Sequence, residues 1–208
     1  IIGMSAVLPK SEDPEAFWEN IVAGRDLTSE VPSDRWNWRE YYGDASRERN
    51  KTRIRRGGFI NDIDKFDPLF FGLSPKEATL MDPQHRLFLE CVWKTIEDAG
   101  YDPASIAGSA TGVYVGVGAP DYSHVIRDHV STIDAHLILG NIFSILANRV
   151  SYLLDFTGPS QPIDTACSSS LVAIECAVDA IREGTIEMAI AGGVNVMLSP
   201  NVFISLDK

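Results

Sequence analysis

Several features that mark other classes of protein are missing from these 208 residues. No apolar run reaches the roughly 20 residues that cross a bilayer, and the sequence does not open on a basic stretch followed by an apolar one. Glycine and proline are spread along the chain, without a low-complexity linker or an internal repeat. We therefore expect a soluble, cytoplasmic protein that does not enter a membrane.

Cysteine is scarce. Cys91, Cys167 and Cys176 form an odd, widely spaced set without a C-x-x-C pair, which predicts neither a disulfide framework nor a zinc site. Three of the four histidines fall between positions 124 and 136, but their spacings of five and seven do not place them on one face of a helix. We expect no bound metal ion.

Positive charge is also in short supply, with 18 basic against 29 acidic residues and a net charge of −11. Nucleic acid is therefore an unfavourable partner, because phosphate binding requires a concentrated positive surface. The exception is the basic segment, residues 47–56, which holds Arg47, Arg49, Lys51, Arg53, Arg55 and Arg56. It is either a solvated loop or a docking surface for an acidic partner.

The pattern that is present alternates strands with helices. Strands are predicted over residues 1–7, 112–118, 160–164 and 188–197, with no closing element after the last one. Helices are predicted from residue 13 to 23, from 74, from 82 to 99, from 142 to 153 and from the cysteine at 167 to Gly184. This order predicts an α/β fold with a largely parallel, covered sheet and no more than two domains.

Two of these helices have an apolar face at helical spacing. In the first helix, Asp13 is the expected N-cap and the apolar face consists of Phe17, Trp18, Ile21 and Val22. In the helix after residue 167 it consists of Leu171, Ile174, Val178 and Ile181. We expect the second set to pack into the core, so that truncating Ile174 or Val178 would leave a cavity.

The most informative segment is 164–170, with the sequence DTACSSS. It places Cys167 where a predicted strand gives way to a predicted helix. A thiol there faces the positive end of the helix dipole and unpaired backbone N–H groups, which favour the thiolate and can hold an oxyanion. Small neighbours such as Thr165 and Ala166 leave room for an acyl group. The local pattern fits a nucleophile and a buried core cysteine about equally.

Two competing motifs fail on inspection. Gly116-Val117-Gly118 follows a strand, but the third glycine of a dinucleotide fingerprint is absent and Pro120 stands where the helix should begin. The serines at 168–170 lack the G-x-S-x-G elbow of serine hydrolases, and we expect them to cap the helix.

Segment 164–170 closely resembles the active-site motif of β-ketoacyl synthases, above all the ketosynthase domains of modular polyketide synthases. Further motifs of that family follow in its order at residues 2–5, 31–36, 57–59, 66–72, 81–86 and 191–195. Residues 36–42 and 148–152 are most similar to ketosynthases of assembly lines whose acyltransferase is a separate protein.

The resemblance implies a thiolase-like layered fold (αβαβα) built from two similar halves. Residues 1–208 are then one N-terminal half of a ketosynthase domain, in which 24–72 is an irregular family-type insertion and no second domain occurs. Both ends are expected to be cut, and the two catalytic histidines of the family are expected beyond Lys208. The isolated residues would be inactive.

For chemistry, the resemblance implies that Cys167 is acylated and that a carrier-bound malonyl-type extender is then condensed onto the acyl group. Ala119 would lie beside the acyl pocket, where a small side chain permits a longer chain, and Thr165 and Ala166 would adjoin the substrate. A small residue at 119 also suits a turn for backbone reasons alone. The implied oxyanion hole uses the Cys167 N–H and a second N–H from the missing half.

No cofactor is expected to bind directly, because the substrates ride on the phosphopantetheine of an acyl carrier protein. The implied partners are that carrier, which the basic segment would help to dock, a second copy through the strand before Cys167, and neighbouring polyketide synthase domains. A domain that transfers chains without elongating them, or a dimerisation scaffold, is the alternative. A thiolase or a fatty-acid ketosynthase is disfavoured by the 24–72 insertion.

Overall fold

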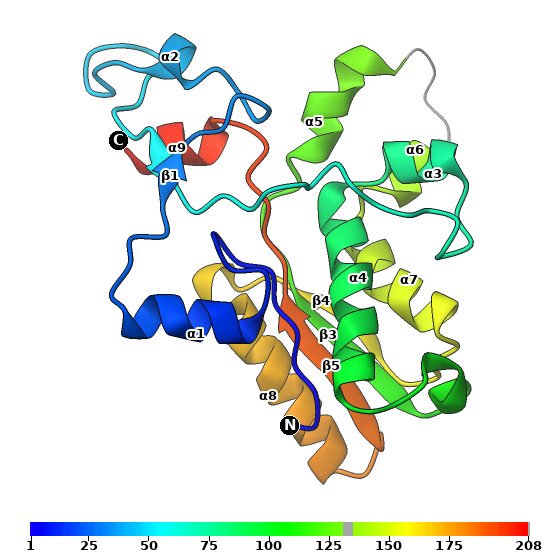
Figure 1. Cartoon of the computed structure of the whole chain (residues 1–208). Coiled ribbons are helices and arrows are strands. Elements are labelled where there is room, and N and C mark those ends of the chain that lie inside the picture. Colours follow the sequence, from blue (N-terminus) through cyan, green and yellow to red (C-terminus); the bar gives the residue numbers. More distant parts are fainter. Residues whose placement is uncertain (131–134, 208) are drawn as a thin grey trace. The chain divides into compact units, whose positions relative to one another are not determined.

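The computed structural model describes residues 1–130 and 135–207 (Figure 1). The chain divides into two compact units. Unit 1 consists of Ile1–Ser5 and Ile63–Asn195, and unit 2 consists of Ala6–Asp62 and Val196–Lys208. The cysteine segment lies in unit 1 and the basic segment lies in unit 2.

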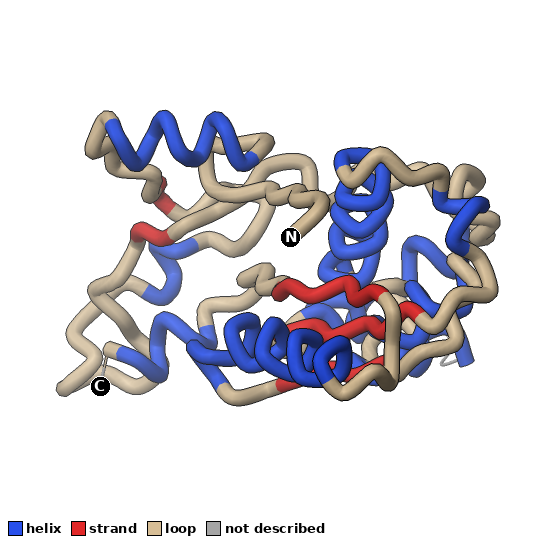
Figure 2. Tube along the Cα trace, turned by 90° about the horizontal axis from the view of Figure 1, so that it is seen from below, coloured by secondary structure: helices blue, strands red, loops and turns tan. Residues whose placement is uncertain are grey.

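A three-stranded parallel sheet forms the centre of unit 1. Strand β3 (Thr111–Gly116) lies between β4 (Ser160–Ile163) and β5 (Met188–Gly193), as Figure 2 shows. All six residues of β3 are buried, as expected for a central strand of a covered parallel sheet. The strand before the cysteine, β4, is an edge of this sheet.

Helices cover both faces of the sheet. Helix α8 (Ser169–Arg182) packs on one face, where Tyr114 contacts Ala173 and Ala177. Helices α4 (Pro83–Asp98) and α7 (Phe143–Leu153) belong to the other face, toward which Val113 and Val115 point. Successive side chains of a strand point to opposite faces, so β3 contributes residues to both cores. The predicted α/β class is confirmed.

The predicted caps of unit 1 are present. Asp82 precedes α4 and accepts a hydrogen bond from the Gln84 N–H at 2.8 Å, and Ser74 caps α3 (Pro75–Leu80). Each of these helices has a proline in its first turn. The remaining short helices of this unit are η1 (Pro103–Ile106), α5 (Tyr122–Ile126), η2 (Arg127–His129), α6 (Ala135–Leu139) and η3 (Ala166–Ser168).

Unit 2 has little regular structure and a small aromatic core. Its elements are α1 (Pro14–Val22), β1 (Ser29–Glu30) paired antiparallel with β2 (Arg56–Gly57), α2 (Trp38–Tyr41) and α9 (Asn201–Leu206). The Trp36 ring centroid lies 5.8 Å from that of Phe59 and 5.3 Å from that of Phe203, both edge-to-face. The interpretation of residues 24–72 as an insertion into a single domain stays a prediction.

Three sequence-based boundaries are wrong. Residues 1–7 form no strand, because a strand requires a hydrogen-bonded neighbour and they have no ladder partner within the described residues. The strand predicted to reach 197 ends at Gly193, where its partner β3 also ends at Gly116. The region after it is not without structure, since α9 forms there.

Within this chain, the apolar face predicted for α8 is not the face that packs on the sheet. Leu171 is 70% exposed and Ile174 is 46% exposed, whereas the helix buries Ala173, Ala177 and Ala180 against the sheet. Small side chains allow the helix backbone to approach the strands closely, and the larger apolar residues are left on the opposite side. The apolar side chains therefore do not identify the buried face.

Helix α1 differs from expectation in the same way. Trp18, Ile21 and Val22 are exposed, and the one fully buried residue of the helix is Asn20. Its side-chain amide donates to the Ser11 hydroxyl at 2.9 Å, so a polar contact anchors this helix. In the described part of the chain, no helix is long and apolar enough to cross a membrane.

Candidate active site

Cys167 lies in the short helix η3, between the end of β4 and the start of α8. Its side chain is exposed, whereas Cys91 on α4 and Cys176 on α8 are half-buried. Within the residues that the structure describes, Cys167 is therefore not part of the core. A thiol in this place is open to a substrate from solvent.

The carboxyl ends of the three strands meet beside this cysteine. The Val117 N–H donates to the Ile163 carbonyl at 3.0 Å, and the Val194 N–H donates to the Gly116 carbonyl at 2.9 Å. The segments that follow β3, β4 and β5 therefore leave the sheet side by side. This edge is where parallel α/β sheets place their ligands.

Two glycines allow α8 to begin directly on the strand ends. A Cβ on Gly116 would lie 2.6 Å from the Ser170 nitrogen, and a Cβ on Gly193 would lie 2.8 Å from the Ser170 Cβ. Both distances are too short for any larger residue without a shift of the helix backbone. The start of α8, and with it Cys167, is thus fixed against the sheet.

The turn before Cys167 is strained and hydrogen-bonded. Ala166 has a φ of 57°, in the left-handed region that residues with a Cβ rarely adopt. Its N–H donates to Asp164 Oδ1 at 3.1 Å, and its carbonyl accepts from the Ser169 hydroxyl at 2.7 Å. The Ser169 oxygen also accepts from the Thr165 N–H at 2.9 Å.

The serines do not cap α8 as expected. Ser168 is the N-cap residue, yet its side chain makes no capping hydrogen bond and donates instead to the Thr165 carbonyl at 2.9 Å. Ser169 links two residues of the turn before the helix, whereas Ser168 bonds only to Thr165, and neither side chain caps the helix. The sequence pattern of three small polar residues could not distinguish the two roles, because both need a short hydroxyl side chain.

Ala119, the predicted acyl-pocket residue, lies half-buried in the segment that follows β3 at the same sheet edge. Its carbonyl accepts a hydrogen bond from Gln84 Nε2 at 3.2 Å. Gln84 is completely buried and lies 3.3 Å from Asp82 Oδ2. Sequence reasoning missed Gln84, although it stands within a recognised motif at 81–86, because nothing local indicates its partner.

Burial changes the protonation of the residues around Gln84. Burial raises the pKa of Asp82 to about 6, and hydrogen bonds from Gln84 oppose this rise. Burial, with a smaller contribution from the Arg149 charge, lowers the pKa of His85 to about 3. The first turn of α4 is therefore a buried polar layer in which the imidazole is neutral at ordinary pH.

Thr165 and Ala166 adjoin Cys167 on one loop, and the segment that holds Ala119 leaves the sheet beside that loop. Of the three histidines between positions 124 and 136, His136 lies 3.9 Å from Glu77 of α3. Within residues 1–130 and 135–207, no group of three or more His, Cys, Asp or Glu side chains could hold a metal ion.

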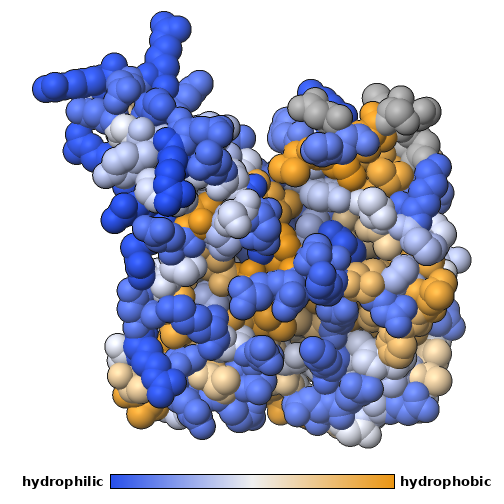
Figure 3. Space-filling view, turned by 45° about the horizontal axis from the view of Figure 1, so that its top comes forward, coloured by the Kyte–Doolittle hydropathy of each residue, from blue (hydrophilic) through white to orange (hydrophobic). Residues whose placement is uncertain are grey.

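The basic segment is exposed but partly neutralised. Arg53 pairs with Asp44 at 2.8 Å, Arg56 pairs with Asp26 at 3.0 Å, and a longer contact of 3.7 Å links Arg55 to Glu30. In Figure 3 hydrophilic side chains gather around α2 and this segment.

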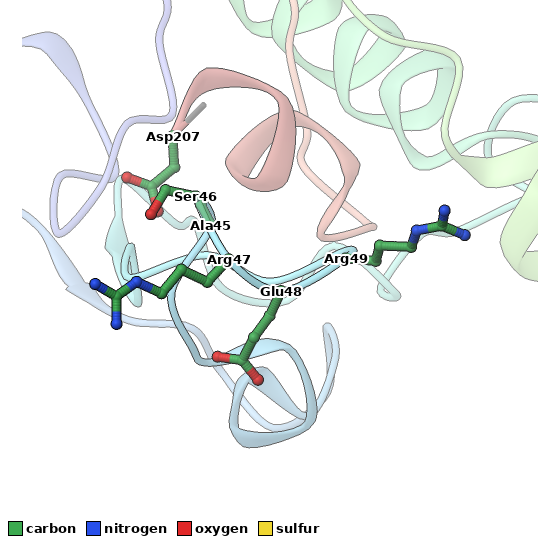
Figure 4. A pocket seen from close by; sticks show the side chains of 6 residues that line it. All are labelled: Ala45, Ser46, Arg47, Glu48, Arg49 and Asp207. Carbon is green, nitrogen blue, oxygen red and sulfur yellow. The ribbon is translucent and has the colours of Figure 1, made fainter.

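Arg47 and Arg49 stand apart within the basic segment, beside an open hollow that Ser46, Glu48 and Asp207 also line. Figure 4 shows both guanidinium groups pointing away from it. Arg47 has only a 3.6 Å contact with Asp44 and is 84% exposed. Among the described residues of the basic segment, the positive charge least neutralised by carboxylates therefore lies at Arg47, Arg49 and Lys51, whose ammonium donates to the Glu40 carbonyl at 2.8 Å.

Comparison with known proteins gives consistent matches over the whole chain. Residues 1–208 match the family model of the β-ketoacyl synthase N-terminal domain. Polyketide synthase PksN of Bacillus subtilis is 50% identical over 208 residues, which are 100% of this chain and 4% of PksN. The pikromycin polyketide synthase component PikAII of Streptomyces venezuelae is 42% identical over 210 residues, covering 100% of this chain and 6% of PikAII.

Solved structures agree. The ketosynthase domain OzmH KS7 for oxazolomycin from Streptomyces albus has a TM-score of 0.89 and 40% identity, over 100% of this chain and 36% of that chain. The module 6 ketosynthase of the Bacillus subtilis bacillaene synthase has a TM-score of 0.85 and 38% identity, over 98% of this chain and 33% of that chain. The chain spans about a third of these structures and a few per cent of the curated relatives. With a thiolase-like fold and a family match from its first residue to its last, this chain belongs to the β-ketoacyl synthase N-terminal domain family.

Proposed function

We propose that this chain carries the nucleophile of a polyketide ketosynthase and that Cys167 is that nucleophile. The observation that carries the proposal is the exposed thiol of Cys167, fixed at the start of α8 on the carboxyl edge of the sheet. Cys91 and Cys176 are less accessible and lie within helices. The family match over residues 1–208 supports the same assignment.

In the first step, the Cys167 thiolate attacks the thioester carbonyl of an acyl chain on a carrier's phosphopantetheine. A bond forms between Sγ and the acyl carbon, the carbon–sulfur bond to phosphopantetheine breaks, and the carrier thiol leaves. The Cys167 N–H is the donor that this chain contributes to the tetrahedral oxyanion. Thr165 and Ala166 leave space beside the thiol, and the turn at Ala119 bounds the acyl chain.

In the second step, a malonyl-type extender on a carrier loses carbon dioxide, and its α-carbon attacks the acyl group on Cys167. A carbon–carbon bond forms, the Sγ–acyl bond breaks, and a β-ketoacyl thioester remains on the carrier. The covalent intermediate divides one difficult reaction into two easier ones. The substrates are carried on phosphopantetheine, so the chemistry requires no cofactor bound by this chain.

The proposed partners are an acyl carrier protein, neighbouring polyketide synthase domains and a second copy of the chain. The edge position of β4 supports pairing of copies through this strand, because an unpaired edge offers free backbone donors and acceptors. Pro162 in β4 limits such pairing on one side of the strand. An assembly line with a separate acyltransferase stays a prediction.

The test is acyl loading by the full-length protein, measured by mass spectrometry after incubation with an acyl-phosphopantetheine thioester. We expect Cys167→Ala to abolish the acyl adduct, while the control Cys176→Ala, which removes a half-buried cysteine in the middle of α8, keeps it. An acylated Cys167→Ala protein would disprove the assignment. Added malonyl carrier then separates elongation, which yields a β-ketoacyl product, from transfer alone, which does not.

A further inference from the structure

We propose that Ser169 is a positioning residue for the nucleophile. Its side chain is buried, with 5% of the residue exposed, although residues 164–168 are all exposed. The hydroxyl accepts from the Thr165 N–H at 2.9 Å and donates to the Ala166 carbonyl at 2.7 Å. Both backbone groups precede Cys167 and Ser169 follows it, so one side chain closes a loop around the nucleophile.

The loop holds a backbone conformation that is costly in isolation. A φ of 57° at Ala166 brings its Cβ close to the backbone, and such a residue persists only where its surroundings hold it in place. Here the N–H of Ala166 is held by Asp164 and its carbonyl by Ser169. The φ of Ala166 sets the direction in which the chain enters Cys167, and hence the direction of the thiol.

The backbone that carries the Ser169 hydroxyl is fixed in place. We call the two hydrogen bonds of this hydroxyl, with Thr165 and Ala166, the Ser169 brace. A Cβ on Gly116 would lie 2.7 Å from the Ser169 carbonyl carbon, so the backbone at Ser169 rests directly on the end of β3. Ser169 transmits this fixed position to the strained turn through its hydroxyl. A capping role does not explain the geometry, because Ser169 bonds to Thr165 and Ala166 and leaves α8 without a side-chain cap.

The proposal rests on the proposed function for the role of Cys167, but its test does not require catalysis. In the full-length protein, alkylation of Cys167 by iodoacetamide and acyl loading are measured for Ser169→Ala and for the control Ser168→Ala. The control removes an exposed hydroxyl that bonds only to Thr165. We expect Ser169→Ala to lower both rates roughly tenfold, with the substrate KM unchanged to about twofold, because the hydroxyl orients the thiol and does not contact substrate.

A second variant separates positioning from general loss of structure. Glycine adopts positive φ without strain, so Ala166→Gly added to Ser169→Ala is expected to recover most of the lost alkylation rate. If Ser169→Ala does not fold, the alkylation rate of Ala166→Gly is compared with that of the double variant. Alkylation rates within about threefold of each other support the brace, because a glycine at 166 no longer needs Ser169 to hold its φ.

Three results would overturn the proposal: Ser169→Ala rates within about twofold of wild type, an equal loss in Ser168→Ala, or no recovery in the double variant. Its failure is distinct from failure of the proposed function, which shows instead as acylation of the Cys167→Ala protein.

Discussion

Gln84 Nε2 donates to the carbonyl oxygen of Ala119 at 3.2 Å, which joins the first turn of α4 to the segment after β3. The two residues are 35 positions apart, and the Gln84 side chain is completely buried. The contact fixes the backbone of the segment that leaves the sheet beside the cysteine loop. Gln84 is therefore placed to control the shape of the proposed acyl pocket without touching the substrate.

Replacing Gln84 should affect both stability and substrate preference. Gln84→Leu removes the buried donor to the half-buried Ala119 carbonyl, which we expect to cost about 1–3 kcal/mol of unfolding free energy. Urea unfolding of the full-length protein measures this loss, and competition between acyl thioesters of different length measures the preference. The control Gln84→Glu keeps the shape of the side chain but places a second carboxylate beside Asp82. Because two buried carboxylates repel each other, this variant should be less stable than Gln84→Leu at neutral pH. Unchanged stability and preference in Gln84→Leu would contradict the role.

His85 should make stability depend on pH. Its residue is 1% exposed, and within the described residues neither ring nitrogen has a hydrogen-bond partner. The folded pKa of about 3 lies below the unfolded value of 6.5, so this contribution is complete above pH 6.5 and is lost as pH falls toward 3. Between about pH 7.5 and about pH 5, we expect the histidine to account for about 2 kcal/mol of lost stability.

The comparison of wild type with His85→Leu isolates this contribution. Asp82 acts in the opposite direction, because its raised pKa of about 6 makes its ionisation destabilising as pH rises from the unfolded value of 3.8 through 6. Both proteins contain Asp82, so its contribution cancels in the difference at each pH. Chemical unfolding at several pH values gives the result, and parallel pH dependence of the two proteins would refute the assignment.

The basic segment offers a test of carrier docking. Because Arg53, Arg55 and Arg56 have acidic neighbours, we expect the double change Arg47→Glu and Arg49→Glu to raise the KM for an acidic carrier and to flatten its salt dependence. Lys65→Glu combined with Lys94→Glu, both in unit 1, makes the same change in net charge and is the control. Loading kinetics across ionic strength that match the control would leave the segment as a solvated loop.

The exposed face of α8 predicts the behaviour of residues 1–208 produced alone. With Leu171 70% exposed, Ile174 46% and Ile181 44%, this chain should self-associate and should not condense acyl and malonyl thioesters. Lysine at these three positions should reduce light scattering by residues 1–208, yet destabilise the full-length protein, where we expect the remaining ketosynthase residues to cover the face. A monomer of residues 1–208 that condensed both thioesters would refute the half-domain interpretation.

Sequence alone located the features whose causes are local. The caps at Ser74 and Asp82 depend on residues within one helical turn, and the helices at 14–22, 83–98, 143–153 and 169–182 follow from spacing and from their terminal residues. The position of Cys167 between a strand and a helix was also predictable, since Gly158 and Pro159 break the chain before the short strand and helical periodicity follows the cysteine.

Tertiary structure decided every property that depends on a distant partner. Residues 1–7 have apolar strand composition but no ladder, β5 stops where β3 stops, and α8 buries its alanines because the strand glycines admit its backbone. The hydrogen bond from Gln84 to Ala119 depends on packing of segments far apart in sequence. The sequence also did not predict the hydrogen bonds of Ser169 with Thr165 and Ala166. A short hydroxyl side chain can cap a helix or stabilise a turn, and only the position of α8 on the sheet selects between these roles.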